Sequence, residues 1–258
     1  MIRDLKLIAS LLLFLMLICG CVRQVVVPDA RPENVLAGIV QPVSGTDRMV
    51  GIARIDVMTA EGHYPVRAAL VFRKPAYLRL ELLPVIGTPD FFLAATPEAM
   101  NIFIPSRAVF YTGKPTADHL ARFLPWSLDI ADLVTILCGS YPALSGQIVS
   151  YAYEQGAKEG VFGIKMRASS GASQLIWVDA QGKLAGLLRF DEAGKEIYQV
   201  LYEDYSSQMA LPGRITIKTA DNQASVSIKY ADMKIETTDD FSVFDLMPPP
   251  GVKIIFLE

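Results

Sequence analysis

Histidine and cysteine are scarce in this chain, which has only 2 His and 3 Cys among its 258 residues. The two histidines, His63 and His119, are far apart in sequence, and no Walker-type glycine loop, HExxH, GxSxG or paired Cys/His spacing is present. We therefore expect no catalytic residues, no metal site and no cofactor. Lys and Arg (24) nearly balance Asp and Glu (27), and neither sign forms a long run. A nucleic-acid-binding protein, which needs a basic footprint, is excluded on this basis.

A hydrophobic run long enough to span a membrane is also lacking. Leu7–Ile18 has twelve uncharged residues, whereas a membrane-spanning helix needs about 20. The run follows a short basic segment, Met1–Lys6, and ends in the sequence Ile-Cys-Gly-Cys, whose last residue is Cys21. This arrangement resembles a bacterial lipobox. The resemblance implies that residues 1–20 are a signal peptide and that a fatty acid such as palmitate acylates Cys21. An ordinary signal peptide and an N-terminal membrane helix are the alternatives.

The residue after Cys21 bears on the location of the protein. In bacterial lipoproteins an aspartate at this position favours retention in the inner membrane, and here the position holds Val22. The resemblance thus implies an outer-membrane protein of a Gram-negative bacterium that faces the periplasm and is held by its acyl chains. Only Cys138 then remains as a free thiol, so we expect no intramolecular disulfide. Cys138 lies on an apolar helical pattern, which favours a small buried hydrophobic residue over a nucleophile.

The mature chain divides into a tether and one domain. Residues 21–48 contain three prolines and no sustained period, which is typical of a tether, although a short helix is expected around Glu33–Val40. From residue 49 to residue 258 the pattern favours antiparallel β-structure. In Tyr77–Leu82 three leucines alternate with charged residues. Turn sequences at Asp179–Gly182 and Asp191–Gly194 lie twelve residues apart. Further strands are expected at Phe91–Ala95, Met100–Ile104 and Ala108–Thr112, and we expect ten or eleven strands in all.

Two amphipathic helices interrupt this strand pattern. Ala117–Leu124 has apolar residues at i, i+3, i+4 and i+7, and the next stretch, from Ile130 to Leu137, repeats that spacing. Ser127 or Asp129 is placed to cap the second helix, and Gly139 to end it. Helices cannot join a strand ladder, so they must cover one face of the sheet. The predicted fold is mainly β (α+β): a curved antiparallel sheet that forms an incomplete barrel, with a helical plug and an apolar space between the two layers.

A family resemblance follows from this order of elements. Strand Tyr77–Leu82, the loop from Leu83 to Thr88, the strands up to Gly113, the helices up to Gly139 and the sequence Leu211–Ile215 are similar to the LolA/LolB-like half-barrel superfamily. The resemblance covers about residues 49–235. Within this superfamily the receptors of the LolB type are themselves lipoproteins, so the lipobox at Cys21 favours that branch. The N-terminal tether and the segment after Ile235 are additions to the family pattern.

The resemblance implies a cavity that accepts the acyl chains of other lipoproteins or of lipids, with a periplasmic carrier as a further partner. An acyl chain needs an apolar lining and no catalytic group. Apolar residues of the strands and of the second helix are suited to such a lining: Leu78, Leu80, Leu82, Phe91, Phe103, Ile130 and Leu137. Each of these residues also fits an ordinary hydrophobic core.

The loop after Leu83 matches an exposed apolar tip that, in the LolB family, helps to deliver lipid into the membrane. Val85 and Ile86 occupy that position here. An apolar loop tip is costly to expose unless it meets lipid or a partner, and the alternative is a loop folded back onto the core. The sequence thus favours an outer-membrane lipoprotein that binds acyl chains and catalyses no reaction. The alternative function is a structural or assembly lipoprotein that binds a protein partner in an envelope complex.

Overall fold

Fourteen strands form one sheet in the part of the chain that the computed structural model describes, residues 29–39, 43–125, 128–155, 160–205 and 211–258. The first meander contains β1 (Asp47–Thr59), β2 (Gly62–Arg73), β3 (Tyr77–Leu83), β4 (Phe92–Ala95), β5 (Met100–Ile104) and β6 (Val109–Gly113). The second contains β7 (Ile148–Gln155), β8 (Val161–Ala168), β9 (Ser173–Asp179), β10 (Leu184–Phe190), β11 (Glu196–Glu203), β12 (Arg214–Thr219) and β13 (Ser225–Thr237). The last strand is β14 (Lys253–Phe256).

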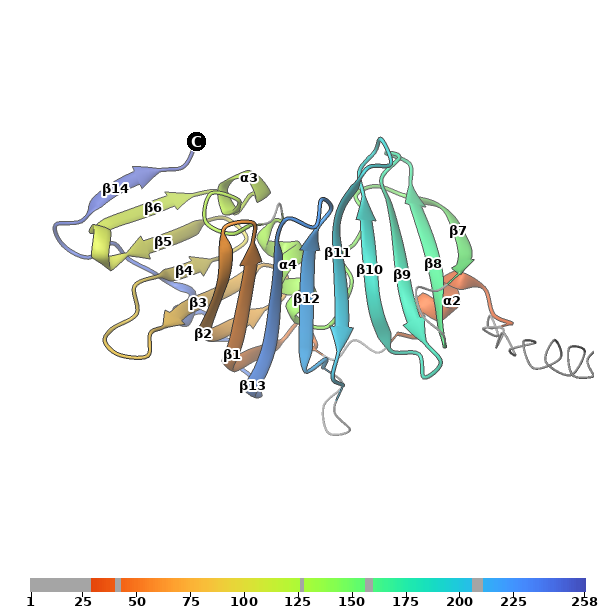
Figure 1. The fold of residues 1–258 in the computed structure, drawn as a ribbon, viewed down its shortest axis with the longest axis horizontal. Coiled ribbons are helices and arrows are strands. Elements are labelled where there is room, and N and C mark those ends of the chain that lie inside the picture. Colours follow the sequence, from red (N-terminus) through yellow and green to blue (C-terminus); the bar gives the residue numbers. More distant parts are fainter. Residues whose placement is uncertain (1–28, 40–42, 126–127, 156–159, 206–210) are drawn as a thin grey trace, which may run out of the picture.

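The two meanders join where β1, the first strand of the first meander, pairs antiparallel with β13, the last strand of the second. The strand order is β14-β6-β5-β4-β3-β2-β1-β13-β12-β11-β10-β9-β8-β7. All pairs are antiparallel except β14 with β6, which is parallel. The sheet bends strongly along this order (Figure 1). The expected fold class, a curved and mainly β structure with few helices, is confirmed, while the expected count of ten or eleven strands was too low.

Local sequence explains the turns of the second meander. Gly182 and Gly194 have φ angles of 77° and 79°, which a residue without a Cβ adopts at little cost. In each turn the preceding aspartate carboxylate accepts hydrogen bonds from two backbone N–H groups; for Asp179 these are the N–H groups of Gln181 and Lys183, both within 2.9 Å. These turn sequences therefore form hairpins, as predicted.

Helix α4 (Ile130–Leu137) lies on one face of the sheet, which we call the inner face (Figure 1). The carboxylate of Asp129 caps the helix by accepting a hydrogen bond from the backbone N–H of Asp132 at 2.7 Å. Ser127, the other candidate cap, lies outside the described residues. After the helix, Gly139 has a φ angle of 69°, which suits a left-handed helix end.

The preceding helix, α3 (Ala117–Leu120), is shorter than the expected Ala117–Leu124. The Thr116 side chain caps its start by accepting a bond from the His119 N–H. Beyond Leu120 the chain continues in turns, and a proline at 125 disfavours helical geometry at Leu124. Of the four residues of the apolar pattern, Leu120 is buried, Ala117 and Leu124 are half-buried and Ala121 is exposed, so the spacing fixed neither the helix end nor a continuous buried stripe.

The N-terminal segment packs against the second meander. Helix α2 (Pro32–Ala37) lies beside β7, and the hydroxyl of Tyr153 donates a hydrogen bond to the Ala30 carbonyl at 2.6 Å. Leu36, Ile39 and Val43 are buried in the core. Part of the expected tether, including Leu36, Ile39 and Val43, thus packs on the domain. The signal peptide, residues 1–20, and Cys21 lie outside the described residues.

The C-terminal segment crosses the outer face of the first meander before it becomes β14. It includes the short helix η2 (Ser242–Phe244), whose Phe244 is buried. Side chains on the outer face hold the segment: Arg79 Nη1 donates to the carbonyl of Asp245 at 3.2 Å, and Asn101 Nδ2 donates to that of Leu246 at 3.3 Å. No helix within the described residues is long and apolar enough to cross a membrane.

Candidate ligand-binding site

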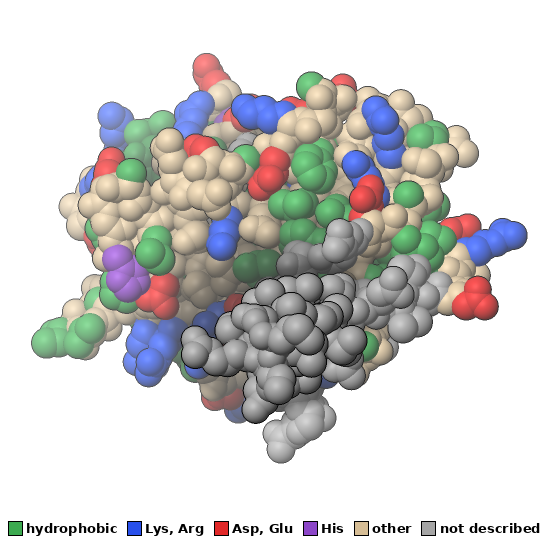
Figure 2. Space-filling model, turned by 45° about the vertical axis from the view of Figure 1, so that its right-hand side comes forward, with side chains coloured by type: hydrophobic (Ala, Val, Ile, Leu, Met, Phe, Trp, Pro, Cys, Tyr) green, Lys and Arg blue, Asp and Glu red, His purple; other side chains and the backbone are tan. Residues whose placement is uncertain are grey.

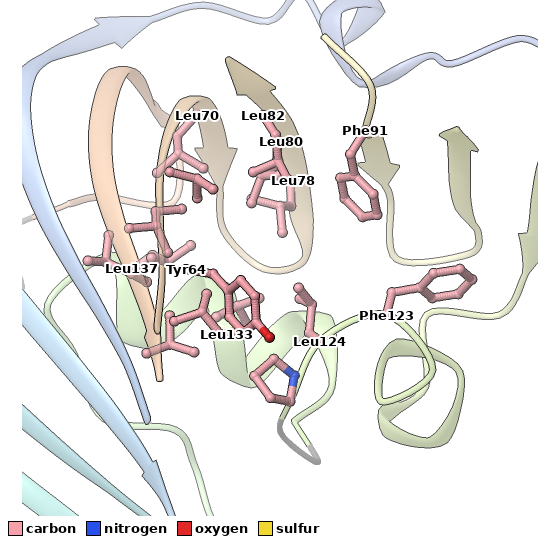
Figure 3. A pocket seen from close by; sticks show the side chains of 16 residues that line it. Tyr64, Leu70, Leu78, Leu80, Leu82, Phe91, Phe123, Leu124, Leu133 and Leu137 are labelled. Carbon is pink, nitrogen blue, oxygen red and sulfur yellow. The ribbon is translucent and has the colours of Figure 1, made fainter. Parts of the chain in front are cut away.

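A cavity of about 250 Å³ lies between helix α4 and the inner face of the sheet (Figure 3). Side chains of β1, β2, β3 and β13 form one wall, and α4 and the chain that leads into it form the other. The lining residues are Ile55, Val57, Tyr64, Val66, Leu70, Leu78, Leu80, Leu82, Phe91, Phe123, Leu124, Pro125, Leu133, Leu137, Val226 and Ile228.

The lining is apolar throughout. The Tyr64 hydroxyl is the one polar side-chain atom among these residues, and none of them carries a charge (Figure 3). A cavity of this kind is expected to stay dry, because water needs two to four polar partners; an engineered apolar cavity of about 150 Å³ stays empty of water and binds benzene. The present cavity is larger. It can hold hydrocarbon, and its side chains supply no carboxylate, imidazole or amine for catalysis.

Five of the seven predicted lining residues meet at this cavity: Leu78, Leu80, Leu82, Phe91 and Leu137. The three leucines share the inner face of β3 because successive side chains of a strand point to opposite faces. Leu137 projects from the last turn of α4 towards them. The alternation in this strand and the helical spacing of α4 therefore located the two walls correctly.

Two predicted residues do not line the cavity. Phe103 lies in register with Phe92 on the neighbouring strand, and their rings stack at 6.1 Å on the outer face. The buried inner position of β5 is held by the preceding residue, Ile102, so the prediction chose the wrong face of a short apolar strand. Ile130 is fully buried in the first turn of α4, but it belongs to the solid part of the core.

Other lining residues were not predicted. Val66 and Leu70 alternate along β2 in the same way as the leucines of β3, so the signal was present in the sequence. Phe123, Leu124 and Pro125 follow α3 and reach the cavity through a turn, for which no periodicity exists. Tyr64, which is 49% exposed, lies at the end where the cavity approaches solvent.

Two tyrosine hydroxyls of the sheet donate hydrogen bonds to carbonyl groups at the C-terminal end of α4 and just beyond it. Tyr230 donates a hydrogen bond to the Leu137 carbonyl at 2.7 Å, and Tyr202 donates one to the Ser140 carbonyl at 2.6 Å. The Leu137 carbonyl is among those at a helix end that have no partner within the helix, and the Ser140 carbonyl follows the helix. The two bonds attach the end of α4 to β13 and β11.

A half-buried carboxylate completes this attachment. The Tyr198 hydroxyl lies 3.4 Å from Asp132 Oδ2, and Arg189 Nη1 donates to Gln174 Oε1 at 3.0 Å beside it. Burial, together with the negative charge of nearby Asp129, raises the pKa of Asp132 to about 6, although the positive charge of Arg189 and the bond from Tyr198 act in the opposite direction. The Asp132 side chain faces away from the cavity, so it serves the helix attachment and not ligand chemistry.

The loop between β3 and β4 exposes its apolar tip. Val85 and Ile86 are 101% and 90% exposed. The loop folded back onto the core, which was the alternative for these residues, is not what the structure shows. The base of the loop is held by Asp90, whose two carboxylate oxygens accept hydrogen bonds from the backbone N–H and the hydroxyl of Ser106. These bonds lower the pKa of Asp90.

The remaining candidate groups have structural surroundings. Cys138 is buried without a disulfide, and burial raises the pKa of its thiol to about 12, so its thiolate form is suppressed. His119 is buried with Nδ1 2.9 Å from the Lys114 carbonyl, and His63 pairs with Asp56 on the surface. Within the described residues, no three His, Cys, Asp or Glu side chains are grouped so as to hold a metal ion.

Comparison with solved structures identifies proteins that have a similar fold. No protein-family model and no curated protein matches the sequence. Among solved structures, a LolA superfamily protein from Nitrosomonas europaea aligns with a TM-score of 0.56 at 13% identity, over 83% of this chain and 97% of that one. A DUF1329 family protein from Desulfovibrio piger aligns with a TM-score of 0.55 at 10% identity, over 83% and 95%.

A third structure is similar in the same way. It is a domain from Vibrio parahaemolyticus described as an outer membrane lipoprotein-sorting protein, with a TM-score of 0.54, 13% identity and coverage of 83% of this chain and 94% of that one. All three alignments span the greater part of both chains. The chain therefore has a LolA-like fold.

Proposed function

We propose that this protein binds the acyl chains of lipoproteins or lipids in the cavity under α4. The observation that carries the proposal is the apolar cavity itself, which is enclosed by two layers and contains a single polar side-chain atom. Its volume of about 250 Å³ approaches the roughly 300–1,000 Å³ of typical ligand sites. Hydrocarbon is the ligand chemistry that such a lining favours, because a polar group would lose its hydrogen bonds to water there.

We further infer that the protein acts in the localisation of lipoproteins to the outer membrane, in the manner of a LolB-type receptor. The lipobox at Cys21 supports a lipid anchor, and Val22 supports an outer-membrane location facing the periplasm. The exposed tip at Val85 and Ile86 supports a contact with lipid. A periplasmic carrier would then supply the ligand. Release of apolar surface from one cavity and its burial in another, at about 25 cal/mol per Å², would drive the transfer.

Uptake of a fluorescent fatty acid tests the binding proposal. The mature chain from residue 21, with Cys21→Ser, keeps every residue that the structure describes and removes attachment through its own acyl chains. We expect saturable uptake. Val66→Trp fills the cavity from the inner face of β2 and should lower the affinity at least tenfold. Val71→Trp is the matched control, because Val71 is also half-buried in β2 but lies on the outer face.

Absence of saturable uptake by the unaltered chain would contradict the proposal, as would equal loss in both tryptophan variants. Mass spectrometry of material extracted from the purified protein gives an independent result. A copurifying molecule with a hydrocarbon chain is expected, and its release should accompany the loss of affinity in Val66→Trp.

Labelling with radioactive palmitate tests the lipid anchor separately. The full chain should incorporate the label, and Cys21→Ser should abolish incorporation and leave the precursor or release the chain from the membrane. An unlabelled full chain would rule out acylation while leaving the cavity proposal intact.

A second candidate function, a structural lipoprotein that binds a protein partner, is favoured by one observation. Strand β7 ends the sheet and pairs with β8 alone among the described strands, and its Val149 and Tyr151 are 59% and 37% exposed. An edge of this kind is able to accept an added strand from a partner. Capture of an envelope protein that is lost on a β7 substitution such as Tyr151→Pro, with no fatty-acid uptake, would favour this function.

A further inference from the structure

Four basic residues lie side by side across four neighbouring strands. The strand register sets Arg67 of β2 opposite Arg54 of β1, Arg54 opposite Lys229 of β13, and Lys229 opposite Arg214 of β12. Strands in a sheet are about 4.8 Å apart, so the four positions span about 14 Å. We call these residues the basic row. They are up to 175 positions apart in sequence, and only the pairing of β1 with β13 brings them together.

The basic row faces away from the ligand cavity. Arg54 alternates along β1 with Ala53 and Ile55, which are buried on the inner face, so its side chain stands on the outer face. Arg54, Arg67 and Lys229 are all exposed. Because these side chains face solvent, a large and flat partner can contact all three of them.

Three of the four side chains of the basic row have no acidic partner in the part of the chain that the structure describes. Arg214 pairs with Asp204 at 3.2 Å, at one end of the row. Among the described residues, the side chains of Arg54, Arg67 and Lys229 take part in no hydrogen bond or ion pair. The closest acidic side chain along β1, Asp56, bonds to His63 at 3.0 Å.

Such an arrangement is unfavourable in isolation, because like charges directly opposite one another on neighbouring strands destabilise a sheet. It occurs in a chain whose net charge is −3, and on the face seen in Figure 2 acidic, basic and hydrophobic side chains are interspersed. An external anion would relieve the repulsion, so the row has the properties of an anion-binding surface.

The exposed apolar tip adjoins the basic row. Arg67 is in register with Leu83, the last residue of β3. The loop that carries Val85 and Ile86 begins with the next residue, Pro84. Cationic side chains next to an exposed apolar loop match a lipid surface, in which anionic headgroups lie above hydrocarbon. An acidic protein segment would account for the charges but not for the apolar loop beside them.

We propose that the basic row and the tip at Val85 and Ile86 form a docking surface for a membrane that contains anionic phospholipid. The headgroup phosphates contact Arg67, Arg54 and Lys229, and the tip enters the interface beside them. This inference deepens the proposed function, since it rests on a location at the membrane, but it does not depend on occupation of the cavity. The docked outer face would leave the cavity and α4 on the opposite side of the sheet.

Vesicle flotation of the mature chain carrying Cys21→Ser tests the proposal, with vesicles of phosphatidylcholine and of an equimolar phosphatidylcholine–phosphatidylglycerol mixture. We expect binding to the anionic vesicles alone, weakened between about 0.1 M and 1 M salt. Arg54→Gln/Arg67→Gln should lower the affinity roughly 30-fold. The control is Lys165→Gln/Arg167→Gln, which removes two exposed cations from β8 of the same sheet and should leave binding unchanged.

A second measurement needs no variant. Acetylation of Lys229 by a water-soluble reagent, followed by mass spectrometry, should slow several-fold in the presence of anionic vesicles, while acetylation of Lys165 stays constant. Equal binding to both kinds of vesicle, equal loss in the two double variants, or unchanged acetylation of Lys229 would overturn the proposal. Protection of Lys229 by poly-glutamate but not by vesicles would also overturn it and assign the row to an acidic protein. Fatty-acid uptake, measured on the same variants, should be unaffected, so failure of the cavity proposal is a separate result.

Discussion

Asp132 is the carboxylate whose environment in this fold most disfavours its charge. It lies in the first turn of α4, where burial and the neighbouring Asp129 raise its pKa to about 6. The folded state therefore holds a proton that the unfolded chain has already released between about pH 4 and pH 6. Stability contributed by this group is present at low pH and is lost as the pH rises through about 6. The contribution of Asp132 to the free energy of unfolding is therefore lower at neutral pH than at acidic pH.

Replacement by a neutral isostere tests this sign. Asp132→Asn should raise the free energy of unfolding at pH 7.5 by about 1–2 kcal/mol and change it little at about pH 3, below the pKa of an unfolded aspartate, because a pKa unit corresponds to about 1.4 kcal/mol. Urea unfolding at the two pH values measures the difference. Asp118→Asn, an exposed carboxylate in the first turn of α3, is the control. Equal effects of Asp132→Asn at both pH values would contradict the assignment.

The three tyrosines around α4 show a second effect at the residue scale. Tyr198 and Tyr202 fall on one face of β11 and read in sequence as an ordinary packing group. In the structure the Tyr202 hydroxyl meets a carbonyl that follows the helix, and Tyr230 from β13 meets another. Burial raises the pKa of both these hydroxyls, so they remain protonated donors. Because a tyrosine side chain has an apolar ring and a polar hydroxyl, it can pack in the core and also bond to the helix.

At the scale of elements, the C-terminal strand closes one end of the sheet. The backbone N–H groups of Lys253 and Leu257 donate to the carbonyls of Ala108 and Thr112, so β14 covers the edge of β6. Leu257 is buried and approaches Gly113, where an added Cβ would lie 2.7 Å from the Leu257 side chain. Its neighbour Phe256 is 73% exposed. The segment that follows Ile235 is therefore part of the folded domain.

Substitutions at two neighbouring residues, one buried and one exposed, test how the C-terminal strand packs on the domain. Leu257→Ala should lower the free energy of unfolding by about 2–4 kcal/mol, because it removes a buried side chain and leaves a void. Phe256→Ala removes a larger but exposed side chain and should change the same quantity by at most about 0.5 kcal/mol. Urea or thermal unfolding measures both. A Phe256→Ala variant as unstable as Leu257→Ala would show that the strand packs differently.

At the scale of the whole molecule, the open layer between helix and sheet has an energetic cost. At about 24 cal/mol per Å³, an empty cavity of about 250 Å³ lowers stability on the order of 6 kcal/mol relative to a filled one. The hydrogen bonds that hold α4, and the sheet that extends well beyond it on both sides, allow the fold to tolerate this cost. A hydrocarbon ligand would recover part of it by restoring the missing contacts.

Occupation of the cavity should therefore raise the melting temperature. A fatty acid at a free concentration about 100 times its dissociation constant adds about 2.7 kcal/mol, which corresponds to roughly 5–10 °C for a chain of this size. Thermal unfolding with increasing fatty acid measures the shift. Val66→Trp should start from an equal or higher melting temperature and gain little from the ligand. A ligand-induced shift of equal size in that variant would place the binding site elsewhere.

The sequence predicted those parts of the fold whose signal is local. The alternation in Tyr77–Leu82 located a wall of the cavity, and the Asp-x-x-Gly turns located two hairpins. Asp129 was one of two candidate caps for α4. Phe103 was wrongly predicted to line the cavity. The sequence of a four- or five-residue apolar strand does not show which of its faces points inward, because that depends on the neighbouring strands. The strand β14 was not predicted for a related reason, since it pairs with a strand more than 140 residues earlier in the chain.

The amino-acid order by itself determined the hairpins and the apolar face of each long strand, and it limited the cap of α4 to Ser127 or Asp129. All of these depend on residues within about ten positions of one another. Only the tertiary structure decided that a space remains under α4, that Val85 and Ile86 are exposed, and that Arg54, Arg67 and Lys229 form one row. The space and the row depend on how the two meanders join at β1 and β13, a pairing between residues far apart in the chain.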